Sequence, residues 1–118
     1  MRVLTGCLLA AITSGYGLAA AACEPPAPVP MPDGATATRD QMLASQAQVR
    51  AYQAAMTEFL ACIDSEQQAE GEQAPDEFKA LMVDRHNAAV AEMEGVAAAF
   101  NDQLRAFRAA NPAPAASN

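Results

Sequence analysis

Large apolar side chains recur at seven-residue intervals in the first half of the chain, with a second series three residues later in each repeat. Positions three and four apart lie on the same side of a helix, so the two series form one seam. The seam consists of Met42, Ser45, Val49, Tyr52, Met56, Phe59 and Ile63. The pattern predicts a helix over about residues 37–69.

A second stretch without proline, about 75–110, carries one broad apolar stripe at helical spacing. Its members are Met82, His86, Ala89, Met93, Val96, Phe100 and Phe107. Folding the chain back near Gly71 places this stripe on the seam, with His86 against Phe59 and partly buried. We therefore expect an all-α fold in which residues 35–111 form an antiparallel two-helix hairpin, followed by a disordered tail over 112–118.

The helix ends carry recognisable signals. Thr38 and Gln41 have the spacing of a capping box, which marks the start of the first helix. Gly71 interrupts the helical pattern, and Pro75 followed by two acidic residues is typical of a first helical turn. Asn111 and Pro112 are expected to end the second helix.

Residues 23–34, here called the arm, contain five prolines between Glu24 and Asp33. This density favours an extended polyproline II path of about 34 Å. The helix from Thr38 to Cys62 measures about 36 Å. An arm lying back along the hairpin would therefore bring Cys23 to Cys62, whereas the alternative is a free proline linker.

Residues 1–22 resemble a secretory signal peptide: Arg2 gives a positive start, an interrupted apolar run follows, and alanines end it. Gly15 and Gly17 make a retained membrane anchor the weaker alternative. We favour cleavage after Ala22, which leaves Cys23 first, with a cut one or two residues earlier as the alternative; each of these cuts removes Cys7. Two cysteines then remain, and a Cys23–Cys62 disulfide is favoured over lipidation of Cys23.

Composition limits the function. Hydrophobic residues make up 52% of the chain, but 30 of its 118 residues are alanine, so the core is thin. A single small domain leaves no room for large enzyme architectures. The net charge of -7 is the wrong sign for nucleic acid, so no nucleic-acid partner is expected.

Candidate chemistry is sparse, and we expect no enzyme activity, catalytic residue, metal or cofactor. No glycine-rich phosphate loop or known catalytic motif occurs. Arg85, His86 and Asn87 form the one mixed polar cluster, but no metal ligand stands three or four residues from His86. The acidic residues around the Gly71 turn lack the spacing of a calcium loop.

The chain resembles a group of small secreted proteins of Gram-negative bacteria that have no assigned function. The shared positions are Cys23, Pro25, Pro26, Asp33, Gly34, Tyr52, Cys62, Arg85, His86 and Asn87. We expect a periplasmic or secreted, non-catalytic protein that binds an unknown envelope protein or itself as a homodimer. The alternative is an outer-membrane lipoprotein, with membrane contact only through a lipid on Cys23.

A second apolar series offers a surface for such binding. Val83, Val90, Ala97 and Leu104 follow one another at seven-residue intervals along the second helix, beside the stripe. This set, called the flank below, is expected to receive either the arm or a second copy of the chain.

Overall fold

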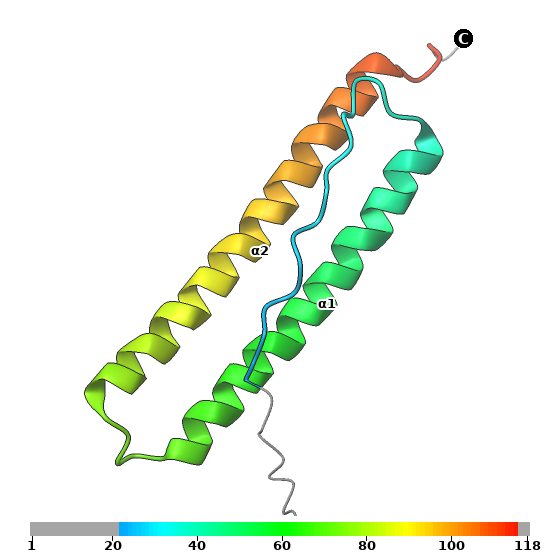
Figure 1. Cartoon of the computed structure of the whole chain (residues 1–118). Coiled ribbons are helices and arrows are strands. Elements are labelled where there is room, and N and C mark those ends of the chain that lie inside the picture. The colour runs from blue at the N-terminus through cyan, green and yellow to red at the C-terminus, as the bar shows by residue number, and fades with distance from the viewer. Residues whose placement is uncertain (1–21, 116–118) are drawn as a thin grey trace, which may run out of the picture.

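The computed structural model describes residues 22–115 and consists of two long helices packed side by side and antiparallel (Figure 1). Helix α1 spans Arg39–Glu70 and helix α2 spans Asp76–Ala110. Residues 22–115 contain no β-strand. The predicted helical hairpin is therefore confirmed, with each helix boundary within two residues of its expected position.

The ends of α1 follow the sequence signals. The Gln41 backbone N–H donates to Thr38 Oγ1 at 3.2 Å, and the Thr38 N–H donates to Gln41 Oε1 at 2.8 Å, which completes the capping box. Gly71 ends the helix with a φ of 71°, a backbone conformation that costs a residue with a side chain more than it costs glycine. The capping signal thus sets where α1 begins, and the glycine sets where the chain turns toward α2.

The core lies between the helices in two clusters. All seven predicted seam residues of α1 are buried. On α2 the buried residues are Met82, Ala89 and Phe100, and Met93, Val96 and Phe107 pack against them partly exposed. The spacing of apolar residues therefore identified the face that each helix presents to the other.

The prediction was wrong for one member of the stripe, His86. His86 is exposed, and the side chain that lies over Phe59 comes from Arg85, whose Cζ is 5.7 Å from the ring centroid. Both residues are within four positions of the buried Met82, so helical spacing alone does not separate them. Arg85 takes the inner position because it finds charged and polar partners there, as described below.

Residues 22–33 form neither helix nor strand and run lengthwise along the two helices (Figure 1). Val29 packs against both core clusters, and Met31 packs against the one containing Met42, Val49 and Phe100. At the far end, the Gly34 N–H donates to Gln103 Oε1 on α2 at 2.8 Å. The chain thus contacts both helices before α1 begins.

The predicted signal peptide lies outside the described residues except for Ala22, which is exposed. Residues 116–118 of the predicted tail also lie outside them. Neither described helix is sufficiently apolar over a membrane-spanning length to cross a bilayer.

Candidate functional site: the junction of the arm with both helices

The first described cysteine joins the arm to α1. Cys23 and Cys62 form a disulfide, with their Cα atoms 5.8 Å apart, and are separated by 39 positions in the sequence. Cys23 is only 8% exposed and belongs to the core cluster that contains Met56, Phe59 and Ile63. The arm therefore begins inside the core.

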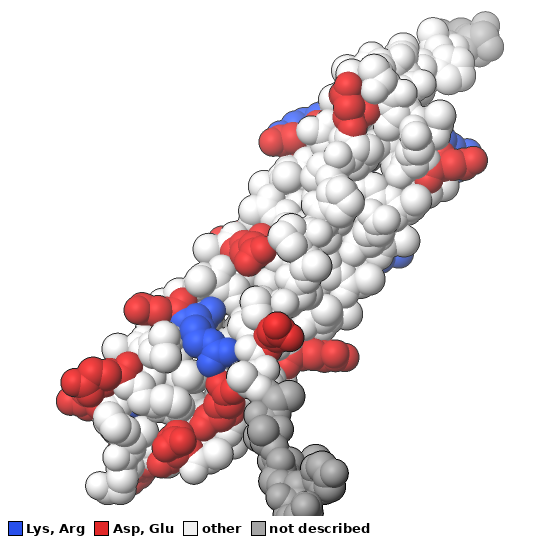
Figure 2. Space-filling model, in the orientation of Figure 1, with Lys and Arg blue, Asp and Glu red and all other residues white. Residues whose placement is uncertain are grey.

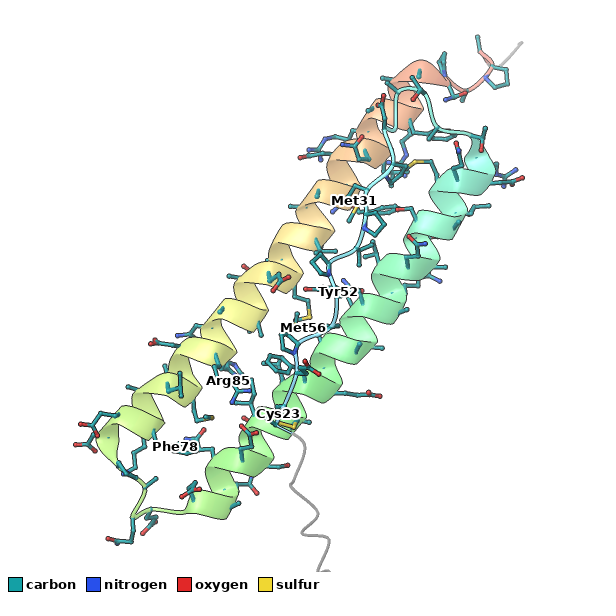
Figure 3. All side chains as sticks on the ribbon, viewed as in Figure 1. Cys23, Met31, Tyr52, Met56, Phe78 and Arg85 are labelled. Carbon is teal, nitrogen blue, oxygen red and sulfur yellow. A yellow bond between two sulfur atoms is a disulfide. The ribbon has the colours of Figure 1, made fainter. Side chains whose placement is uncertain are left out.

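Arg85 reaches this junction from α2 (Figure 3). Its Nη2 donates to the backbone carbonyl oxygen of Cys23 at 2.9 Å, and its Nη1 donates to Glu66 Oε2 at 2.7 Å. The guanidinium also stands over the Phe59 ring, in the arrangement of a cation–π contact. With its side chain 26% exposed, Arg85 connects the arm, α1 and α2 through one planar group.

Glu66 completes the junction from α1. The Cys23 backbone N–H donates to Glu66 Oε1 at 3.1 Å, so each carboxylate oxygen has its own donor. The Cys23 amide is the larger cause that lowers the pKa of Glu66 below its usual value, and the hydrogen bond from Arg85 adds to it. The ionised form of Glu66 is therefore the one that the folded junction favours.

The structure divides the predicted polar cluster. Arg85 points into the junction, whereas His86 and Asn87 are exposed and contribute nothing to it. Glu66 was missed by sequence reasoning, although it follows Cys62 by four residues and so lies one turn further on the same face of the helix. That spacing beside an expected disulfide was the available signal.

The junction offers little free chemistry. The two sulfur atoms and a Glu66 oxygen lie within 4.8 Å of one another, the one group in the described chain with the proximity a metal ion needs. Both sulfurs are bonded to each other, however, and a disulfide is not the thiolate that binds metals. The polar atoms of the junction instead hold the start of the arm.

Two buried hydroxyl groups lie on α1, that of Ser45 in the second turn and that of Tyr52 near the middle of the helix. Burial is the main cause that raises the pKa of Tyr52, and the charge of the nearby Glu92 carboxylate and a hydrogen bond to it raise it further. The Ser45 hydroxyl has no hydrogen-bond partner among the described residues, and a buried hydroxyl of this kind costs stability. Tyr52 belongs to the core cluster that contains Met56 and Phe59.

The chain matches no protein-family model, and comparison with curated proteins and with solved structures yields no match. Its resemblance to the secreted group remains a prediction.

The lowered pKa of Glu66 makes the stability of the fold depend on pH in the acid range. Its contribution is complete above the ordinary value of 4.5 and is lost as pH falls through the lower folded-state pKa. We expect the melting temperature of the native chain to fall below pH 4.5 more steeply than that of Glu66→Gln, as measured by circular dichroism. Glu70→Gln, which removes an exposed carboxylate from the last residue of α1, should keep the native slope. Parallel profiles for the native chain and Glu66→Gln would contradict this assignment.

Proposed function

We propose that this chain is an exported, non-catalytic protein of the periplasm or external medium that acts by self-association. The arm is an integral third element of the fold in this proposal, and the helices are the interacting surface. The observation that carries self-association is the exposed Val83 of the flank, and the disulfide at the junction supports export. An oxidising compartment suits that disulfide.

The distribution of charge agrees with a binding role on the helices. On the arm side, acidic side chains gather toward the turn between α1 and α2, whereas the middle of this face is mostly uncharged (Figure 2). Lys and Arg side chains do not gather together on this face. This face therefore offers no basic patch for an anionic ligand.

The flank is the favoured contact surface because its first member, Val83, lies exposed and away from the arm. The arm reaches α2 at Arg85 and Gln103. With 3.6 residues per turn, Val83 lies about 200° around the helix from Arg85. Val83 is 53% exposed, whereas Val90, Ala97 and Leu104 are partly buried, and Leu104 packs against the core cluster that contains Met42, Val49 and Phe100. Two copies that pack these flanks together would form a four-helix bundle.

The self-association test uses two neighbouring apolar residues on opposite sides of α2. Val83 and Leu81 are 53% and 52% exposed, and only Val83 belongs to the flank. We expect the chain beginning at Cys23 to sediment as a dimer, and Val83→Glu to weaken the dimer at least about tenfold because it buries an unpaired charge. Leu81→Glu should sediment as the native chain does. A native chain that is monomeric at every concentration, or equal effects of the two substitutions, would exclude this surface.

A further inference from the structure

We propose that the chain is cut between Ala22 and Cys23 and that Glu66 is the built-in counter-ion for the new α-ammonium group of Cys23. This inference rests on the proposed export of the protein. It adds a defined processing bond and a positioning residue for its product. The evidence is the signal-like sequence before that bond and the contacts of Cys23 after it.

The sequence before the Ala22–Cys23 bond resembles the end of a signal peptide, and the chain becomes buried directly after the bond. The alanines that end the signal-like segment lead directly to Cys23. Ala22 is exposed, whereas Cys23 is the first buried residue of the described chain. The side chain, nitrogen and carbonyl oxygen of Cys23 are each fixed, by Cys62, Glu66 and Arg85 respectively. The folded structure thus begins at the residue that cleavage would make the N-terminus.

The covalent step is hydrolysis by a peptidase. Water adds across the Ala22–Cys23 amide: its hydroxyl completes the carboxyl group of Ala22, and its other hydrogen goes to the Cys23 nitrogen. At neutral pH the new carboxyl group releases a proton, and the new amine takes one from solvent, because an α-amino group has an ordinary pKa of about 8. The nitrogen that was a neutral amide donor becomes a cation.

Glu66 is already placed to receive that cation. Its Oε1 is 3.1 Å from the Cys23 nitrogen, which is the distance of a hydrogen bond now and of an ion pair after cleavage. Its second oxygen is held by Arg85, so the two cations would share the carboxylate with one oxygen each. The Glu66 side chain is 31% exposed, which reduces the screening of the pair by solvent relative to a fully exposed pair.

The same geometry leaves no site for lipidation of Cys23. A lipoprotein cysteine carries a diacylglyceryl group on its sulfur through a thioether and an acyl group on its nitrogen. Here the sulfur is bonded to Cys62 and the nitrogen lies against Glu66. The proposal therefore requires an unmodified N-terminal cysteine.

The first experiment determines the terminus. The full precursor is expressed in a Gram-negative host, and the intact mass of the product is measured separately for the cytoplasm, the envelope and the medium. We expect an exported chain of residues 23–118 whose mass is lower by two hydrogen atoms than that of the reduced form. A lipid increment, a different terminus or an uncut precursor would each overturn the inference. Of these results, a precursor retained in the cytoplasm would also contradict the proposed export, whereas the others would contradict only this inference.

The second experiment tests the ion pair itself. Chains that begin at Cys23 and at Ala22 are melted under oxidising conditions, in the native background and in Glu66→Gln. Retaining Ala22 restores a neutral amide at Cys23 and moves the ammonium group one residue away. We expect the Cys23 chain to melt about 3 °C or more above the Ala22 chain, with this difference reduced by high salt.

Comparing the two termini within each background isolates the pair, since Glu66→Gln weakens the Arg85 contact in both chains equally. The difference should disappear in Glu66→Gln and persist in the control background Glu70→Gln. Equal melting of the two native-background chains, or a difference that survives in Glu66→Gln, would show that Glu66 is not the counter-ion.

Discussion

Replacing Cys62 by serine should lower the melting temperature of the oxidised protein by roughly 15 to 30 °C. The disulfide restricts the unfolded chain, and a cross-link across 39 residues contributes about 4 kcal/mol on the loop-closure argument. Helix content at low temperature should change little, because both helices and their seam remain. Circular dichroism spectra and melting curves of the two proteins measure both quantities.

Reductant supplies the matched control for this prediction. It should lower the melting temperature of the native chain to that of Cys62→Ser and leave the variant unchanged. Cys23→Ser should behave as Cys62→Ser does. Equal melting of the native chain and Cys62→Ser without reductant would mean that the bond adds no stability.

Gly34→Ala should produce the second-largest loss, about 2 to 3 kcal/mol or roughly 10 °C or more in melting temperature. Gly34 packs directly on α2: a Cβ added to it would come within 1.9 Å of the backbone carbonyl oxygen of Gln103. Real atoms do not approach so closely, so the turn must move away from the helix. The hydrogen bond from Gly34 to Gln103 and the packing of Met31 would be disturbed together.

Gly95→Ala is the matched control, because a Cβ there has no neighbour within 4 Å. Gly95 lies in the interior of α2, where alanine is favoured over glycine by up to about 1 kcal/mol. Thermal melting should therefore show opposite signs for the two substitutions. Truncating the Gln103 side chain should not rescue Gly34→Ala, since the clash is with backbone. A Gly34→Ala protein as stable as the native chain would contradict the close packing.

The hairpin was predictable because its determinants are local. The capping box at Thr38 and the break at Gly71 depend on residues a few positions apart. The seam of α1 repeats regularly enough to place all seven buried residues in advance. Helical periodicity involves residues only a few positions apart, so it can be recognised in a single sequence without knowledge of the tertiary fold.

The junction was not predictable in the same way because three distant segments meet there. Spacing placed His86 inside because it falls on the apolar stripe, whereas the neighbouring Arg85 can take the inner position only with partners for its guanidinium. Those partners are the carbonyl oxygen of Cys23 and the carboxylate of Glu66, 62 and 19 positions away. Sequence periodicity contains no information about which carbonyl oxygen a folded arm will present.

The disulfide also decides how the molecule responds to mechanical load. A pull applied at Cys23 passes through the sulfur bond into α1 at Cys62, so the loop of residues 24–61 between them carries no tension. An extended chain spans at most about 3.6 Å per residue, so the intact disulfide prevents roughly 140 Å of chain from being extended by the load. The arm and most of α1 are then sheltered, and the load falls on the last turns of α1 and on α2.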